Sequence, residues 1–487
     1  MNVGGLILGA LRGWKTFCGI TLFCVAATLA SRAQTLTTVV SFDNSNGGAP
    51  WAVVQGVDGK LYGTAWSGGT NGLGTVFVIN TTGTLTTLHN FASADGWGPT
   101  ELVLGANRSF YGLATFGSGA TGGSLFTVTS KGRFTLLDTF SGLGASDNSL
   151  LLSTNGNFYG TTILGGSNGW GSVFKMTPTG TFSTLYNFDC FGLLACPNEA
   201  GPSGLAQGTD GNFYGTNTGG NSASDVGTIF KITPTGTLTT LYTFCTQGPP
   251  CSDGDWPTGL TQAADGNFYG TTIWGGISGS ACQANSPGGC GTIFKITPTG
   301  TLTTLYTFCT QGPPCSDGGL PSPWSPLIQG TDGNFYGTTF TGSACFPLGP
   351  CGTIFRMTPS GALTTLHVFN YADGSESRRL MQATDGNLYG TAEGGAYDAG
   401  TIFRLSTGLR PFVKFVQSAG RVGQTIGIIG QGFKGTTSVS FNGTAATFTI
   451  VSGNLITVAV PTGATTGFVT VQKPSGTVKS NVVFHVL

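Results

Sequence analysis

Residues 204–244, GLAQGTDGNFYGTNTGGNSASDVGTIFKITPTGTLTTLYTF, decide the fold. Apolar and aromatic residues alternate with threonine in this stretch, as the two faces of a pleated strand require. Asp210-Gly211 suits a tight hairpin turn, and Pro234-Thr235-Gly236 marks a second turn. The stretch therefore predicts an antiparallel sheet of four strands: Gly204–Gln207, Asn212–Thr216, Thr228–Thr233 and Thr237–Phe244.

The same pattern occurs seven times along the chain. Its aromatic-Tyr-Gly or Leu-Tyr-Gly step recurs at Tyr62, Tyr111, Tyr159, Tyr214, Tyr269, Tyr336 and Tyr389. The seventh copy lacks a fourth strand, and residues 35–42, TLTTVVSF, match the missing strand position for position. Such a strand would close a ring and remove both sheet edges. We predict an all-β fold in which residues 34–405 form a seven-bladed β-propeller closed by the N-terminal strand; an open β-solenoid is the alternative.

The lengths of the connections divide the two ends of each predicted sheet. The turn residue and the Tyr of the second strand are four residues apart in every copy, as in Asp210 and Tyr214. By contrast, the step from that Tyr to the Phe of the third strand varies from 14 residues (Tyr389 to Phe403) to 25 (Tyr269 to Phe294). Alternate connections of a meander lie at the same end. All length variation is therefore expected at one end of the sheets.

Residues 1–33 have the pattern of a secretory signal peptide, with a positively charged start, an apolar stretch from Phe17 to Ala30 and cleavage between Ala33 and Gln34. An N-terminal membrane anchor is the alternative, although the apolar stretch is shorter than the roughly 20 residues that span a bilayer. The pattern predicts a secreted, periplasmic or cell-surface protein, with no membrane insertion after the signal is removed.

Ten cysteines remain after cleavage, and they fall into five close pairs. An even number in local pairs behind an export signal predicts disulfides within single connections. Zinc ligation is the alternative, but C-x2-C spacing is absent and the chain has 3 histidines. The predicted pairs are Cys190–Cys196, Cys245–Cys251, Cys282–Cys290, Cys309–Cys315 and Cys345–Cys351.

Composition excludes several classes of protein. Charged residues make up 8% of the chain, the net charge is zero and no basic run occurs, so nucleic-acid binding is not expected. Glycine numbers 83 of 487 residues, which disfavours a helical fold because glycine destabilises helices. The apolar share of 39% disfavours disorder. We expect a folded β protein that is a monomer.

The repeated unit resembles a known family. The D-G-N-F-Y-G-T-T step at 265–272, with a following G-G and G-T-I-F, resembles the GloVer-type tandem repeats of secreted bacterial proteins, over roughly residues 35–405. The second copy departs most, with Asn107-Arg108-Ser109-Phe110 at the first turn. The resemblance implies no established chemistry.

The repeats stop near Leu405, and residues 406–410 form a short linker. Residues 411–487 predict a small β-sandwich, because short alternating strands are separated by turn sequences such as Asn442-Gly443 and Pro461-Thr462-Gly463. This segment resembles an IPT/TIG domain, an immunoglobulin-like module. The resemblance implies a spacer or adhesive unit.

Catalytic residues are not predicted. His89 and His367 occupy the fourth-strand position that holds Tyr in other copies, which favours packing over acid–base chemistry. Five aspartates occupy the same turn of the repeat, where Asp is favoured because its side chain stabilises the turn: Asp58, Asp210, Asp265, Asp332 and Asp385. Carboxylates from different blades could still meet at the ring centre. A second set of Asp-Gly steps after the fourth strand could hold structural calcium, although ordinary turns explain it better: Asp95, Asp253, Asp317 and Asp373.

Tryptophans mark the candidate ligand face. Trp51 and six further tryptophans lie at or near the variable end: Trp66, Trp97, Trp170, Trp256, Trp274 and Trp324. Indole rings on a nearly uncharged scaffold suit sugar rings, and packing between blades is the alternative. We expect a secreted binding or adhesion protein for an extracellular glycan or protein ligand. The competing hypotheses are a carbohydrate-active hydrolase or lyase and a structural cell-envelope component. No cofactor is predicted.

Overall fold

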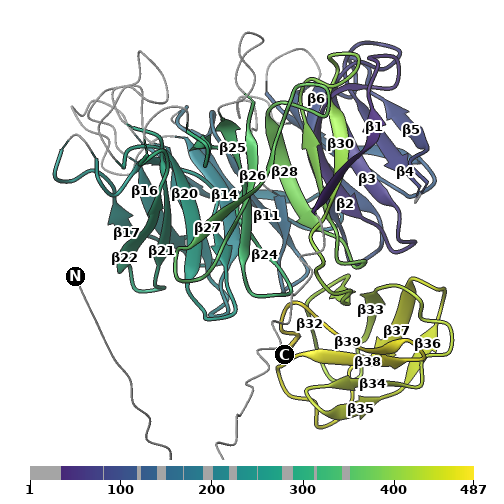
Figure 1. Cartoon of the computed structure of the whole chain (residues 1–487). Helices are drawn as coiled ribbons and strands as arrows, with labels where there is room; N and C mark the ends of the chain where they lie inside the picture. The colour runs from purple at the N-terminus through teal and green to yellow at the C-terminus, as the bar shows by residue number, and fades with distance from the viewer. Residues whose placement is uncertain are drawn as a thin grey trace, which may run out of the picture. The chain divides into compact units, whose positions relative to one another are not determined.

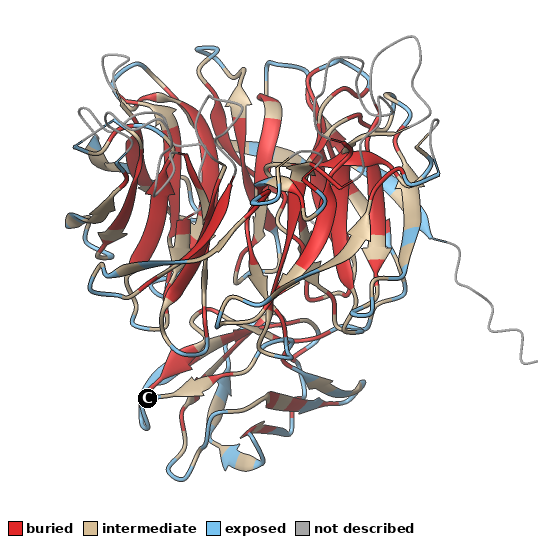
Figure 2. Cartoon of the chain, turned by 90° about the vertical axis from the view of Figure 1, so that its left-hand side faces the viewer, coloured by how far each residue is buried: buried red, intermediate tan, exposed pale blue. Residues whose placement is uncertain are grey.

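The computed structural model describes residues 34–487 except 81, 118–121, 140–149, 168, 190–200, 219–226, 249–250, 277–288, 312–314 and 343–350. The described residues form strands, turns and loops without a helix (Figure 1), and so they contain no helix long and apolar enough to cross a membrane. Buried residues concentrate in the strands and exposed ones in the turns (Figure 2). The chain is all-β, as predicted.

Seven antiparallel sheets account for the described part of the repeat region. Four of them each contain four strands in chain order: β2 (Gly48–Gln55), β3 (Leu61–Ser67), β4 (Thr75–Ile79) and β5 (Leu85–Asn90); β6 (Trp97–Leu104), β7 (Phe110–Phe116), β8 (Ser124–Val128) and β9 (Phe134–Thr139); β10 (Leu150–Leu152), β11 (Phe158–Thr162), β12 (Ser172–Met176) and β13 (Phe182–Asn187); and β14 (Pro202–Gln207), β15 (Phe213–Asn217), β16 (Thr228–Ile232) and β17 (Leu238–Thr243).

In the fifth and sixth sheets the first strand is broken in two. These sheets contain β18 (Asp255–Pro257), β19 (Thr261–Gln262), β20 (Phe268–Trp274), β21 (Thr292–Ile296) and β22 (Leu302–Thr307), and then β23 (Gly319–Pro321), β24 (Ile328–Gln329), β25 (Phe335–Thr341), β26 (Thr353–Met357) and β27 (Leu363–Val368). The strands of the fourth copy differ from the predicted bounds by one or two residues at an end, because turn residues fall outside the ladder and because the pairing of Pro202 with Asn217 extends the first two strands.

The seventh sheet joins the two ends of the repeat region. It contains β28 (Ser377–Gln382), β29 (Leu388–Ala392), β30 (Thr401–Ser406) and, beside β30, the N-terminal β1 (Thr35–Ser41). β1 and β30 run antiparallel, with Thr35 opposite Ser406 and Ser41 opposite Thr401 (Figure 1). The predicted pairing of residues 35–42 with the strand at Gly400–Leu405 is confirmed.

Aromatic rings connect each sheet to the next by a repeated contact. In the first five sheets the Tyr of the second strand packs on the Phe of the next second strand, as in Tyr214 and Phe268, whose centroids are 4.1 Å apart. The seventh and first sheets have Leu388 and Leu61 at the position of that Phe. The Phe after a fourth strand likewise meets the third-strand Phe of the next sheet, as in Phe244 and Phe294 at 5.3 Å. Phe42, directly after β1, makes this contact with Phe77 of the first sheet at 5.2 Å. The seventh sheet therefore joins the first as other sheets join their neighbours.

A row of glutamines at the ends of first strands makes the same connection. The Gln262 side chain of the fifth sheet accepts a hydrogen bond from the backbone N–H of Thr209 in the fourth, at 2.9 Å. Gln55 of the first sheet accepts one from Thr384 in the seventh at 3.0 Å, and its Nε2 donates back to the Thr384 hydroxyl. The repeat thus specifies its own neighbour contacts, including the contact between the last sheet and the first.

The aspartates of the repeated first turn are structural, as predicted. The Tyr214 hydroxyl donates to Asp210 Oδ2 at 2.9 Å, and four other copies have the same bond. In the second copy Asn107 takes this place, and its Nδ2 donates to the Tyr111 hydroxyl. Arg108 there adopts a φ of 66°, where the other copies have glycine. The divergent turn therefore keeps the same shape despite its different residues.

Residues 411–487 form two four-stranded antiparallel sheets and a short parallel pair. A buried core that includes Val413, Phe433, Phe441 and Phe484 fills the segment. Its assignment to the IPT/TIG modules stays a prediction. The strands, in sheet order, are β31 (Lys414–Phe415), β33 (Thr425–Ile429), β37 (Leu455–Ala459) and β36 (Phe448–Ile450); β35 (Thr444–Ala446), β34 (Ser438–Phe441), β38 (Val469–Lys473) and β39 (Gly476–Lys479); and β32 (Ala419–Gly420) with β40 (His485–Val486).

Two of the five predicted disulfides, Cys245–Cys251 and Cys309–Cys315, are present. Cys290 and Cys351 are also disulfide-bonded, but their predicted partners, Cys282 and Cys345, and the pair Cys190 and Cys196 lie outside the described residues. Both described bridges lie within a single connection, as predicted, and Cys245, Cys251 and Cys309 are buried within the apolar clusters of their sheets.

Removal of one buried disulfide should lower stability modestly. The double variant Cys309→Ala/Cys315→Ala opens a short loop, for which the chain-entropy model gives about 2 kcal/mol of lost unfolding free energy. Urea unfolding of the oxidised proteins measures this loss. Because the fourth and fifth repeats place their cysteines alike, Cys245→Ala/Cys251→Ala should have the same effect within error. An unchanged unfolding midpoint in both variants would contradict a stabilising role.

Candidate functional site

The first strands of the sheets depart from the repeat at a few positions. Regular copies have Pro202-Ser203-Gly204-Leu205 and Pro257-Thr258-Gly259-Leu260. In the first copy Trp51 replaces Ser or Thr, and in the second copy Glu101 replaces Gly. In the seventh copy Arg378 stands at the Ser or Thr position and Arg379 at the Gly position. The sixth copy has three inserted residues, Pro323-Trp324-Ser325. The strand register shifts at these places in the first, second, fourth and seventh sheets.

The irregular residues meet in space, and we call Trp51, Glu101, Trp324, Arg378 and Arg379 the first-strand cluster. Arg379 Nη1 donates to Glu101 Oε1 at 2.5 Å, although the two residues are far apart in sequence. Arg379 Nε donates to the Trp324 carbonyl oxygen at 3.2 Å. One guanidinium thus connects the second, sixth and seventh sheets.

Arg378 lies against two indole rings. Its guanidinium is 4.3 Å from the Trp51 ring centroid and 4.8 Å from the Trp324 centroid, and the two indoles meet edge to face at 5.8 Å. Arg378 also forms an ion pair with Glu393. Stacking of this kind favours arginine over lysine, because the planar guanidinium is weakly hydrated and retains its in-plane donors.

Glu101 is the carboxyl group of the cluster, and it is deeply buried. Its side chain is 6% exposed, and its Oε2 has no hydrogen-bond partner among the described residues. Burial raises the pKa of Glu101 above its usual range, while Arg379 acts in the opposite direction. A buried carboxylate oxygen without a donor costs free energy, so its presence in a folded protein calls for a functional explanation.

Two cavities border the cluster. The smaller, of about 50 Å³, is lined by first-strand residues of five sheets and includes Trp51, Gly204, Gly259, Trp324 and Arg379. The larger, of about 400 Å³, we call the aromatic groove. It shares Trp51 with the smaller cavity and draws on the first, second, third and seventh sheets: Trp51, Trp66, Thr115, Phe116, Ile163, Leu164 and Arg378. Because residues of five different sheets line the smaller cavity, this cavity lies where the first strands of those sheets come together.

Family comparison fits this repeat pattern. The model of the Gloeobacter/Verrucomicrobia repeat matches residues 9–193, 146–281 and 202–451. The chain belongs to this family. The expected GloVer-type resemblance is thereby confirmed, while no match supports the IPT/TIG assignment. No curated protein matches the chain.

Solved structures resemble the fold of this Gloeobacter/Verrucomicrobia repeat protein at low identity. The extracellular domain of a hybrid two-component system from B. thetaiotaomicron has a TM-score of 0.50 and 9% identity, with 86% of this chain and 46% of that chain covered. A protein assigned as a gluconolactonase has a TM-score of 0.40 and 12% identity, with 78% of this chain and 94% of that chain covered. A luciferin-regenerating enzyme has a TM-score of 0.40 and 12% identity, with 66% of this chain and 94% of that chain covered. At 9% identity the likeness to the first of these structures, with its TM-score of 0.50, concerns the fold alone.

The repeat protein brings some of the predicted tryptophans together. Trp66 borders the aromatic groove and meets Trp97 edge to face at 5.8 Å, while Trp97 stacks on Phe116 at 3.7 Å. Trp51 and Trp324 belong to the first-strand cluster. Sequence reasoning missed Glu101, Arg378 and Arg379, which the departures from Gly204 and Gly259 could have identified.

The other predicted tryptophans border neither cavity. Trp170 packs against the cluster around Tyr159 and Phe213. Trp256 is 38% exposed, and Trp274 lies in the same sheet, opposite Asp255. A ligand face formed by all these rings stays a prediction.

The histidines of the repeats have structural partners. His89 Nε2 is 3.1 Å from Asp95 Oδ2, and its ring stacks on Phe134 at 3.8 Å. In the fourth repeat the Tyr242 hydroxyl donates to the equivalent Asp253 at 2.8 Å. The second set of Asp-Gly steps therefore binds fourth-strand side chains, a role that sequence reasoning did not assign.

The variant His89→Tyr should unfold less readily in acid. Burial lowers the pKa of His89 below its usual 6.5, against the opposing effect of Asp95. A depressed pKa favours neutral histidine in the folded state. Its contribution to stability is therefore present above pH 6.5 and lost as the pH falls below that value. Melting temperatures at pH 7.5 and 5.0 should differ more for the wild type than for His89→Tyr, and an equal difference would contradict this role.

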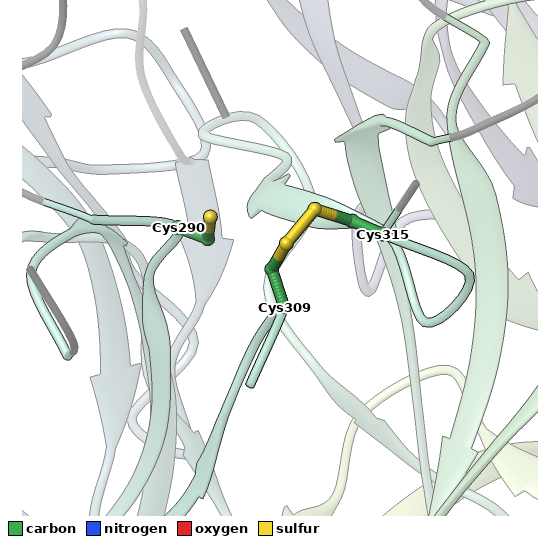
Figure 3. A group of neighbouring side chains, drawn as sticks. All are labelled: Cys290, Cys309 and Cys315. Carbon is green, nitrogen blue, oxygen red and sulfur yellow. A yellow bond between two sulfur atoms is a disulfide. The ribbon is translucent and has the colours of Figure 1, made fainter. Parts of the chain in front are cut away.

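Three cysteine sulfurs lie within 4.8 Å of one another at Cys290, Cys309 and Cys315 (Figure 3). Figure 3 shows the disulfide between Cys309 and Cys315, with Cys290 beside it. Cys290 is itself disulfide-bonded. Metal ions bind thiolates, so this sulfur group is not a metal site while its disulfides are intact.

Proposed function

We propose that the seven sheets form a seven-bladed β-propeller closed by β1, and that residues 411–487 are an immunoglobulin-like module of the IPT/TIG type. The contacts of Phe42 with Phe77 and of Gln55 with Thr384 support closure, because they repeat the contacts made between other neighbouring sheets. We further propose that residues 1–33 are a signal peptide and that the mature protein is exported. The intramolecular disulfides are consistent with an oxidising compartment.

We propose that this protein is a non-catalytic binding protein that holds a neutral glycan in the aromatic groove. The single observation that carries the proposal is the groove itself, in which Trp51, Trp66 and Phe116 from neighbouring sheets surround about 400 Å³. Apolar walls with few polar groups are typical of ligand sites. Arg378 supplies hydrogen-bond donors, and the charge of Glu393 balances its own.

A second candidate function is supported by Glu101. A buried carboxyl group with a raised pKa beside an arginine is typical of acid–base sites. The carbohydrate-active hydrolase or lyase would use Glu101 as the proton-transferring group. Release of reducing sugars from polysaccharides, and its loss in Glu101→Gln, would favour this enzyme over the binding protein.

A glycan array probed with the mature chain, beginning at Gln34, tests the binding function. We expect saturable binding to one or more neutral glycans that changes little between 50 and 500 mM NaCl, because the site has balanced charges. Heat-denatured protein is the control. Absence of binding to every neutral glycan would contradict the proposal.

A further inference from the structure

Two arginine–glutamate ion pairs lie at the proposed site. Arg378 borders the aromatic groove and pairs with Glu393, whereas Arg379 borders the smaller cavity and pairs with Glu101. The two arginines are consecutive residues of β28, so one strand presents a guanidinium to each cavity. Each guanidinium has a carboxylate at ion-pair distance among the described residues, and Glu376 is a further carboxylate that interacts with Arg378. Neither guanidinium therefore presents an uncompensated positive charge to its cavity.

The fold does not require these charges. The positions equivalent to Glu101 are Gly204 and Gly259 in the regular copies, and the fourth sheet forms its first-strand ladder around Gly204 without a charged side chain. Burying Glu101 costs desolvation, and its Oε2 recovers no hydrogen bond within the described chain. A buried ion pair of this kind is weak support for stability, because apolar residues of similar volume often serve equally well.

The pairs nevertheless determine which ligands the cavities can accept. An unpaired guanidinium would bind a carboxylate through two parallel hydrogen bonds. A guanidinium already neutralised by glutamate offers donors to hydroxyl groups but no net charge to a carboxylate. An acidic sugar would then lose its hydration without an opposite charge to compensate, whereas a neutral sugar would not.

We propose that Glu101 and Glu393 are specificity-determining residues, which neutralise Arg379 and Arg378 so that the site selects uncharged sugars over uronic acids. This inference rests on the proposed glycan-binding function. It adds a charge filter to that function: the arginines hold the ligand hydroxyls, and the glutamates exclude ligands that carry a carboxylate.

The test compares Glu393→Gln and Glu101→Gln with the wild type on paired probes. The probes are galactose, glucose and mannose oligomers and the corresponding oligouronates on one array, with affinities then measured by titration. The wild type should prefer the neutral member of a pair. Each variant should raise the uronate-to-neutral affinity ratio by about tenfold or more, since a charge-assisted bond replaces a neutral one. Added NaCl should reduce that gain.

The matched control is Asp210→Asn. It changes the net charge by the same amount at a turn where the second and third copies naturally have Asn107 and Asn155, and it leaves Lys231 without its partner. The uronate-to-neutral ratio should not change in this variant. An equal rise there would attribute the effect to overall charge and overturn the inference.

The outcomes separate the inference from the function on which it rests. If the wild type binds no glycan, the proposed function fails. If it binds neutral glycans and both glutamine variants keep the wild-type ratio, or if the wild type already prefers uronates, the charge filter fails and the binding function stands. The Glu393 side chain is 34% exposed, so Glu393→Gln should fold. If Glu101→Gln does not fold, the affinity ratio of Glu393→Gln by itself decides whether the charge filter exists.

Discussion

A mature chain that begins at Asn44, without β1, should lose most of its stability. The deletion removes Val40 and Phe42, which are 9% and 0% exposed, and burial of such side chains contributes about 3–6 kcal/mol in total. It also leaves β30 with an unpaired edge, which is a template for aggregation. Because folded domains are stable by about 5–15 kcal/mol, urea unfolding should shift to a far lower midpoint.

Point variants separate closure from a general truncation effect. Phe42→Ala should by itself lower the unfolding free energy by about 3–5 kcal/mol, because it removes a buried aromatic ring from its contact with Phe77. Thr37→Ala alters an exposed side chain of the same strand and should have little effect. If the truncated chain unfolds at the wild-type urea concentration, β1 does not close the repeat array.

Trp66→Ala should weaken glycan binding by about 30-fold or more, the loss expected for an aromatic residue at the centre of a binding site. Trp66 borders the aromatic groove and is only partly buried, so its ring can stack on a sugar while the strand beneath it remains intact. Titration with the best glycan from the array measures the loss. Trp66→Phe keeps an aromatic face and should recover part of the affinity.

Trp256→Ala is the matched control for this loss. Trp256 is an exposed tryptophan of the fifth sheet that does not border the groove. Its removal should leave the affinity unchanged. An equal loss in Trp256→Ala would extend the site to the broader tryptophan face that the sequence predicts, and an unchanged affinity in Trp66→Ala would place the ligand outside the groove.

The sheets were predictable because their information is local and repeated seven times. The alternation at 204–244, the turn at Asp210-Gly211 and the N-terminal match to the missing strand all lie within short windows. Some strand bounds differ because turn residues such as Asn212 bind side chains instead of joining the ladder. In the fourth copy the ladder also extends to Pro202 and Asn217, beyond the predicted bounds. The pairing of β1 with β30 was predictable from a comparison of residues 35–42 with the other fourth strands.

The site was only partly predictable because its contacts are not local. Glu101 and Arg379 come together only when the second and seventh sheets meet, so no spacing within one repeat reveals the pair. The connection lengths placed the tryptophans near one end, but they did not separate Trp66, which borders the groove, from Trp170, which packs against a core cluster. Departures from the Gly204 position were visible in the sequence, but the sequence does not show which of these residues come into contact when the sheets pack together.

A crystal structure of the mature protein with the glycan that binds most tightly on the array tests the central claim most directly. We expect the sugar to lie in the aromatic groove, with one ring face against Trp66 or Trp51 and hydroxyl groups within hydrogen-bond distance of Arg378. A glycan bound elsewhere, on the fifth sheet or on residues 411–487, with the groove holding only water, would contradict it.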